Sequence, residues 1–306
     1  MKQEIRLSLT VTGRLDRALA YALGIGRAAI KRSFAAGEVR VRGRRARAAD
    51  PATPGALVEV ELEAPAGPPI PDPGAALRIL EEGPGWLVAE KPAGIATHPL
   101  REGETGTLAN AVVARHPECA EASPEPRDGG ALQRLDLETS GCVLFARSRA
   151  AWEALRAQLS AHTVEKGYLA LVAGRVGSGG VCSVALAQRG GRVVAVPDPA
   201  RPPRSTGKPR EAETHFEVRR AYAQHTLLEV RIVTGVMHQI RAHLEFLGHP
   251  VVGDVLYGGQ AAALPGLERH LLHAAVLGFD RPEGGRVRVQ SPLPREMESI
   301  LAHLDG

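Results

Sequence analysis

The chain has few of the features that mark membrane, secreted or metal-binding proteins. No stretch of its 306 residues holds the roughly 18 consecutive apolar residues that a transmembrane helix needs. Residues 1–10 alternate polar and apolar side chains and lack the apolar core of a signal peptide. The three cysteines, Cys119, Cys142 and Cys182, lie far apart and form no CxxC pair. We therefore expect a cytoplasmic protein that binds no membrane and has neither a disulfide framework nor a zinc site.

Positive charge is concentrated near the N-terminus. The net charge is only +4, yet residues 1–63 hold 12 Lys and Arg against 7 Asp and Glu. Residues 27–47 contain a single acid, Glu38, among eight cations. These cations are Arg27, Lys31, Arg32, Arg40, Arg42, Arg44, Arg45 and Arg47. Such a cluster can be an ordinary solvated face, but its density favours contact with a polyanion such as RNA.

The basic segment has the pattern of a small α/β module. Leu15, Leu19 and Leu23 recur four apart, which predicts a helix over 14–24 that glycine ends. A second helix is expected over 27–36, and residues 39–44 and 57–62 alternate as strands do. A Pro- and Gly-rich linker at 64–75 follows. We therefore place one domain at 1–63 and a larger one at 76–306.

The larger segment has more strand-like than helix-like stretches. Apolar strand patterns occur at 86–89, 142–146, 168–172, 227–233 and 286–289. Helical patterns occur at 108–115, 150–161 and 238–247. This distribution predicts an α+β domain with a mostly antiparallel sheet. Residues 177–210, rich in Gly, Pro and Arg, are expected to form a long exposed loop.

Asp136 is the first candidate for a chemical role. It lies between Leu135 and Leu137 and just before the apolar run 142–146. A carboxylate in such surroundings is poorly solvated, so its charge is costly unless a cation pairs with it. Taken alone, this acid is either a structural ion-pair partner or a reactive group.

Four further segments place polar residues within tight apolar sequence. They are KPAGIATHP at 91–99, EKGYLALV at 165–172, TGVMHQIRAHL at 234–244 and HPVVGDVLYG at 249–258. Together with QRLDLETSG at 133–141, they resemble the RluA family of pseudouridine synthases in wording and order. The resemblance spans roughly residues 76–282, and the N-terminal module resembles the S4 RNA-binding domain that several members carry.

The resemblance implies an isomerase that converts uridine in RNA to pseudouridine, with a catalytic domain of pseudouridine synthase type. By it, Asp136 is the nucleophile, Arg241 is its cationic partner, and Tyr168 packs against a base taken out of the RNA stack. The reaction needs no cofactor and no metal. The implied RNA-contacting residues are Gln133, Arg134, Arg27, Lys31, Arg32, Arg40, Arg42 and Arg44.

Two departures from the family pattern stand next to the predicted site. Gln133 replaces the usual histidine, and Val236-Met237 stands where Arg-Thr is common. Glutamine still donates and accepts hydrogen bonds but does not titrate, so it can alter substrate choice. The second change removes a cation and one possible phosphate contact.

Other motifs have plainer explanations. His238, His243 and His249 fit no compact set of metal ligands and are expected to be core or hydrogen-bonding residues. Lys91 is expected to shape a loop, and Asp254 and Tyr257 are expected to be structural.

The combination most resembles the enzymes that modify large-subunit ribosomal RNA. The alternatives are an enzyme of the same chemistry that acts on transfer RNA and a catalytically silent RNA-binding or ribosome-assembly factor. We expect a monomer that binds RNA and not DNA.

Overall fold

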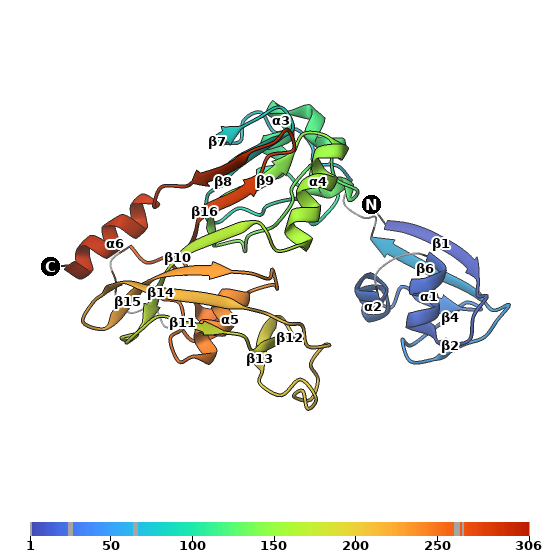
Figure 1. Ribbon diagram of the computed structural model, residues 1–306. Helices are drawn as coiled ribbons and strands as arrows, with labels where there is room; N and C mark the ends of the chain where they lie inside the picture. Colours follow the sequence, from blue (N-terminus) through green and yellow to red (C-terminus); the bar gives the residue numbers. More distant parts are fainter. Residues whose placement is uncertain (1, 24–26, 64–66, 260–263, 265, 306) are drawn as a thin grey trace. The chain divides into compact units, whose positions relative to one another are not determined.

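The computed structural model describes residues 2–23, 27–63, 67–259, 264 and 266–305 (Figure 1). Contacts divide the chain into two compact units, residues 1–67 and 68–306. In the ranges given above, no helix is both long and apolar enough to span a bilayer.

Unit 1 is a small sheet with two helices. Its antiparallel sheet has the order β1, β6, β3, β4, and a two-residue pair joins β2 to β5. The elements are β1 (Lys2–Ser8), β2 (Gly13–Arg14), α1 (Leu15–Leu23), α2 (Arg27–Ala36), β3 (Val39–Val41), β4 (Arg44–Arg45), β5 (Pro51–Ala52) and β6 (Leu57–Glu63). Leu15 and Leu19 of α1 are fully buried against Val58 and Val60 of β6, as the four-residue spacing predicts. The strand β1 was not predicted, although residues 2–8 alternate.

Unit 2 is built on one long, mixed sheet. The sheet runs in the order β11, β14, β15, β10, β16, β9, β8, β7, and β17 also pairs with β16. The strands are β7 (Arg78–Glu82), β8 (Trp86–Lys91), β9 (Ser140–Ala146), β10 (Glu165–Ala173), β11 (Gly180–Cys182), β14 (Thr214–Ala221), β15 (His225–Ile232), β16 (Leu272–Asp280) and β17 (Arg286–Gln290). Adjacent strands are antiparallel except for β9 and β16, which are parallel. The predicted α+β class with a mostly antiparallel sheet is confirmed for this unit.

Helices cover parts of both faces of this sheet (Figure 1). They are α3 (Leu108–Arg115), α4 (Arg149–Ser160), α5 (Gln239–Phe246) and α6 (Arg295–Asp305), with short 3-10 turns η1 (Pro117–Glu121), η2 (Pro126–Asp128) and η3 (Val255–Tyr257). Leu144 of β9 packs with Leu155 of α4, whereas its neighbour Phe145 packs with Val112 of α3. Both faces of β9 are therefore buried, which explains its unbroken apolar run.

The parallel contact between β9 and β16 is short and close. Ser140 and Gly141 pair with His273 and Ala274. A Cβ atom on Gly141 would lie 2.2 Å from the backbone oxygen of Ala274, so only glycine allows this approach. The pairing fixes the start of β9, directly after the segment that holds Asp136.

The prediction of a long exposed loop over 177–210 is wrong for residues 180–196, whereas residues 197–209 are irregular and mostly exposed. This segment contains β11 and a hairpin of β12 (Ala185–Arg189) and β13 (Arg192–Val196). The turn consists of Gly190 and Gly191, a pair that suits the tight turn of a two-residue hairpin. The hairpin is anchored because Leu186 and Val193 are buried in a cluster with Tyr257.

Candidate active site

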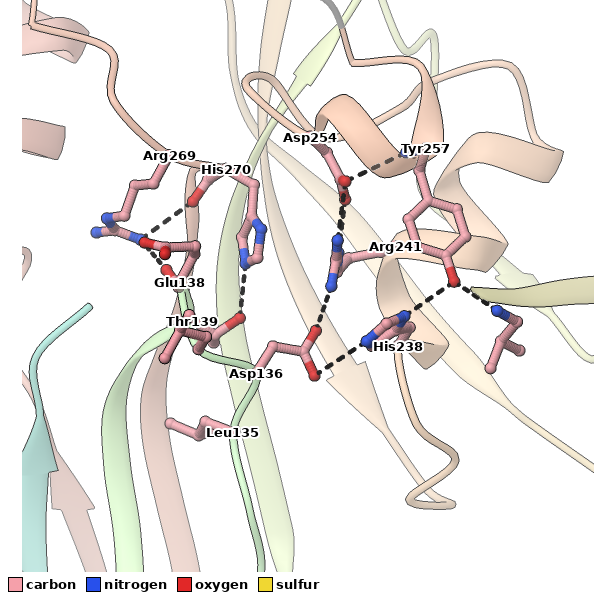
Figure 2. Close-up of polar contacts among 12 residues, drawn as sticks. Leu135, Asp136, Glu138, Thr139, His238, Arg241, Asp254, Tyr257, Arg269 and His270 are labelled. Atoms are coloured by element: carbon pink, nitrogen blue, oxygen red, sulfur yellow. Dashed lines mark hydrogen bonds and ion pairs between the residues drawn. The ribbon is translucent and has the colours of Figure 1, made fainter. Parts of the chain in front are cut away.

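Asp136 lies in a loop that leads into β9 (Figure 2). A turn closes this loop, because the Thr139 amide donates a hydrogen bond to the Asp136 carbonyl at 3.0 Å. About a quarter of the side chain is exposed, 24% by area. The carboxylate is thus accessible to a substrate while the backbone beneath it is fixed.

Arg241 of α5 connects Asp136 to a second acid. Its Nη1 donates to Asp136 Oδ2 at 2.7 Å, and its Nε and Nη2 donate to the two oxygens of Asp254 at 2.6 and 2.9 Å. Burial opposes the charge of Arg241, but the hydrogen bonds to Asp254 and Asp136 outweigh it and raise the pKa of the guanidinium. The bidentate pair fixes the plane of the guanidinium, so Arg241 presents one N–H to Asp136 in a set direction.

Asp254 is a site residue that sequence reasoning assigned only a structural role. Its side chain is 1% exposed, and it also accepts the Tyr257 amide at 3.2 Å as the N-cap of η3. Its position in the GDVLYG stretch, one of the segments that resemble the family, could have marked Asp254 as a site residue. What could not be inferred was that it shares Arg241 with Asp136.

His238 approaches the other oxygen of Asp136. Its Nε2 lies 3.8 Å from Asp136 Oδ1, and its Nδ1 lies 3.1 Å from the Tyr257 hydroxyl. Burial lowers the pKa of His238, so the ring is neutral at pH 7. The two carboxylate oxygens of Asp136 therefore have different neighbours, Arg241 at one and a neutral imidazole at the other.

Buried side chains from elsewhere in the chain hold the loop around Asp136. Arg269 donates to the Glu138 carbonyl at 2.8 Å and to Ser140 Oγ at 3.2 Å, and it forms an ion pair with Glu296. Thr139 Oγ1 lies 2.8 Å from His270 Nε2 (Figure 2). Burial lowers the pKa of His270 to about 4, so it stays neutral.

Lys91 also holds this loop. Its side chain is fully buried, and its Nζ donates to the carbonyls of Pro92, Ile95 and Leu137 at 2.8 to 2.9 Å. The predicted loop-shaping role of Lys91 is confirmed. Burial lowers its pKa to about 8, and three acceptors satisfy its three donors.

Tyr168 lies on β10, half-buried against the apolar cluster that includes Ile240 of α5. Burial raises the pKa of its hydroxyl, and the negative charge of Asp136 raises it further. The phenol is therefore protonated at neutral pH and near enough to Asp136 to be affected by its charge. Asp136, Tyr168 and Arg241, predicted from separate motifs, are gathered in one region of unit 2.

Comparisons with known proteins identify the fold and the chemistry. Residues 85–246 match the family model described as RNA pseudouridylate synthase. A protein from Chloroflexus aurantiacus named uncharacterized RNA pseudouridine synthase is 36% identical over 95% of this chain and 90% of its own length. The chain belongs to the RNA pseudouridylate synthase family. It is an RNA pseudouridine synthase, an isomerase.

Other relatives of this synthase carry more specific names. Two proteins named ribosomal large subunit pseudouridine synthase D, from Xanthomonas campestris and Xylella fastidiosa, are 35% and 40% identical. They cover 88% and 74% of this chain, and the matches span 81% and 69% of their own lengths. The solved structure of human RNA pseudouridylate synthase domain containing 1 superposes with a TM-score of 0.57 at 25% identity, over 73% of this chain and 86% of that one.

Gln133 and Arg134 precede Asp136 in the loop that leads into β9. Arg134 is exposed, whereas Gln133 is half-buried and its Oε1 has no hydrogen-bond partner among the described residues. A buried acceptor without a partner is costly in the free protein. Gln133 therefore has an unmet hydrogen bond at the position where the histidine is usual.

The predicted basic residues of unit 1 that the structure describes are exposed. Lys31 lies on α2, and Arg40, Arg42 and Arg44 lie on or between β3 and β4. Arg42 and Gly43 both have positive φ, 51° and 74°, and form the two-residue turn of this hairpin. The side chains of Arg27 and Arg32 lie outside the described residues.

The three histidines of the 234–258 region make hydrogen bonds, as the sequence predicts. His243 bonds Thr214 Oγ1 and the Val184 carbonyl, and His249 bonds the Ala173 carbonyl. His238 faces Tyr257 and Asp136, as described above. Within the described ranges, no group of three or more His, Cys, Asp or Glu is arranged to hold a metal.

Proposed function

We propose that this synthase modifies one or more uridines of large-subunit ribosomal RNA, with Asp136 as the nucleophile. The observation that carries the assignment of Asp136 is its pairing with Arg241, which Asp254 fixes from behind. The choice of RNA is supported by the relatives named ribosomal large subunit pseudouridine synthase D. A transfer-RNA substrate with the same chemistry is the alternative.

The reaction is an isomerisation that needs a nucleophile and no added group. The ionised carboxylate of Asp136 attacks the target uridine, and the carbon–nitrogen bond to the ribose breaks. The detached uracil then rejoins the ribose through carbon, and the carboxylate leaves. The base loses a proton from that carbon and gains one at the nitrogen, so the atoms balance.

Arg241 and Tyr168 serve different parts of this reaction. The Arg241 N–H donates to Oδ2 at 2.7 Å and holds it, which leaves Oδ1 available for attack. Tyr168 offers an aromatic face to a uridine taken out of the RNA stack, and its protonated hydroxyl can donate a hydrogen bond to the base.

Two exposed basic hairpins are suited to hold the RNA. In unit 1, which we propose to be S4-like, the turn between β3 and β4 carries Arg40, Arg42 and Arg44. In unit 2, the hairpin β12–β13 and the segment after it expose further cations: Arg189, Arg201, Arg204, Lys208 and Arg210. Lys and Arg on such projections bind phosphates without reading sequence.

The nucleophile assignment is tested with Asp136→Asn. We expect pseudouridine formation to be abolished while RNA affinity stays within about three-fold, because the amide keeps the shape but cannot attack. The control is Asp280→Asn, which removes an exposed acid of β16. Activity in Asp136→Asn comparable with the control would refute the mechanism.

The substrate is tested by mapping pseudouridines in ribosomal and transfer RNA from cells with and without the gene. Loss of a site in large-subunit ribosomal RNA supports the proposal, and loss confined to transfer RNA replaces it with the alternative. Intact maps in both RNAs would favour a silent RNA-binding factor.

A further inference from the structure

His238 has a backbone conformation that is unusual for a residue with a side chain. It is the N-cap of α5 with φ of 54° and ψ of 20°, in the left-handed region. Strained positions of this kind persist where surrounding structure enforces them and often occur at functional sites. Here the conformation directs the imidazole between Tyr257 and Asp136 (Figure 2).

Tyr257 determines which ring nitrogen of His238 carries the proton. The Val193 amide donates to the Tyr257 hydroxyl oxygen at 2.8 Å, and this oxygen lies 3.1 Å from His238 Nδ1. A phenol has one hydrogen, and Nδ1 is its hydrogen-bond partner in the described structure. Nδ1 is therefore the acceptor, and the neutral ring carries its proton on Nε2, which faces Asp136.

The contact between Nε2 and Asp136 Oδ1 is close but not yet a hydrogen bond. At 3.8 Å it exceeds hydrogen-bonding distance. Hydrogen bonds at catalytic sites are often long in the free enzyme and shorten when the substrate binds. Oδ2 is already held by Arg241, so a donor at Oδ1 would fix the remaining rotation of the carboxylate about its Cβ–Cγ bond.

We propose that His238 is a positioning residue that aligns Oδ1 of Asp136 for attack, and that Tyr257 fixes the His238 tautomer that does so. This inference rests on the proposed role of Asp136 as the nucleophile. It adds a second support for the carboxylate to the Arg241 contact. This support begins at Val193, just after the turn of the β12–β13 hairpin.

The test compares two amides at position 238. The side-chain nitrogen of glutamine can reach the place of Nε2, whereas that of asparagine corresponds to Nδ1 and stays away from Asp136. Asparagine, however, tolerates the left-handed conformation better. Single-turnover pseudouridine formation is measured on total RNA from cells that lack the gene, with RNA affinity measured in parallel.

We expect His238→Gln to keep the rate within about three-fold and His238→Asn to lower it about 30-fold, both with unchanged affinity, because misplacing a reacting group costs rate rather than binding. Equal rates, or a faster His238→Asn, would overturn the proposal and assign position 238 to backbone conformation alone. The matched control is His162→Asn, at an exposed residue with φ of 58°. An Asp136→Asn variant that stays active would defeat the nucleophile assignment separately.

A second measurement does not depend on the stability of these variants. Nitrogen-15 spectra of histidine-labelled wild-type protein should show the His238 signal, absent from the His238→Gln spectrum, with the proton on Nε2. Tyr257→Phe keeps the ring but removes the hydroxyl, so part of this signal should move to the other tautomer. A proton on Nδ1 in the wild-type protein would overturn the proposal.

Discussion

Arginine side chains have opposite surroundings in two regions of this synthase. Arg241 and Arg269, around Asp136 and its loop, are each 7% exposed and are bound to carboxylates and carbonyl oxygens. Arg40, Arg42 and Arg44, on the unit 1 hairpin, are exposed to solvent. The first pair fixes atoms that must meet a substrate within tenths of an ångström, whereas the second group is suited to attract phosphates over several ångströms.

A count of charges along the sequence identifies only the exposed arginines of the unit 1 hairpin. The dense run of cations at 27–47 is visible in composition alone. The buried arginines are isolated in the sequence, and their function depends on partners that fold close to them. Substitutions of the buried residues should therefore lower stability and reaction rate. Substitutions of the exposed arginines should lower RNA affinity.

The largest effect on stability is expected from Asp254→Asn. It leaves the buried Arg241 with a single acid, and loss of one partner from a buried ion pair costs about 3 kcal/mol of unfolding free energy. Trp86 and Trp152, the two tryptophans of the chain, both lie in unit 2, so their fluorescence during urea unfolding reports this unit alone.

The matched control for this variant is Asp280→Asn. Asp280 pairs with Arg286 at 3.2 Å, with both side chains about half exposed at 58% and 48%. Exposed pairs contribute less than about 1 kcal/mol. Equal losses in the two variants would mean that the Arg241–Asp254 pair is not the fixed support described above.

A somewhat smaller loss of stability than in Asp254→Asn is expected from Lys91→Met. Methionine fills similar space but removes one donor from three part-buried carbonyl oxygens, of which that of Leu137 keeps the Gly94 amide, at a total cost of about 2 kcal/mol. Because one of them belongs to Leu137, next to Asp136, single-turnover pseudouridine formation should also fall about ten-fold. A stability loss with an unchanged rate would show that Arg269 and His270 hold the loop adequately without Lys91.

Because His270 is buried and neutral, the free energy of unfolding should depend on pH, by an amount similar to or smaller than the loss in Lys91→Met. Its folded-state pKa of about 4 lies below the ordinary value of 6.5, so on acidification the unfolded chain takes up a proton first. Its contribution to stability is complete above pH 6.5 and is lost as the pH falls toward 4. Between pH 7.5 and 4.5, His270→Gln should lose about 2 kcal/mol less unfolding free energy than the wild type. The exposed His162→Gln should follow the wild-type curve, and a His270→Gln curve that does the same would refute the assignment.

The smallest effect on stability is expected from replacing Arg40, Arg42 and Arg44 together by glutamine. Exposed charges contribute little to folding, but each lost phosphate contact lowers the salt dependence of RNA binding by about 0.9 in the log–log slope. Affinity should therefore fall and the slope flatten while the single-turnover rate at saturation is unchanged. The control replaces three exposed arginines of unit 2, Arg115, Arg156 and Arg219. Equal slopes in the two triple variants would make the hairpin an ordinary solvated face.

Much of the fold was predictable because residue spacing and apolar runs within each segment indicate its secondary structure. The leucine spacing of α1 and the apolar runs of β8 and β9 placed those elements correctly. The β12–β13 hairpin was missed because its glycines and arginines resemble a loop, although Gly190-Gly191 between alternating residues is a hairpin signal.

The site was predictable only where a motif marked it. Asp136, Tyr168 and Arg241 were singled out through the family resemblance, and the structure places them in one region of unit 2. Arg269, His270 and the double pairing of Arg241 were not, because nothing local shows that residues more than 100 positions apart will meet. Such contacts arise from the sheet order, in which β16 pairs with β9.

That pairing has a consequence for protein synthesis. Strand β16 borders the loop that holds Asp136. This strand, with the residues Arg269, His270 and His273 that hold the loop and the start of β9, is translated about 130 positions after Asp136. At about 5 to 20 residues per second, this delay is on the order of ten seconds. A nascent chain can complete unit 1 in that interval, while the loop that carries Asp136 still lacks the contacts from Arg269 and His270. The enzyme is thus expected to acquire its catalytic activity among the last events of its own synthesis.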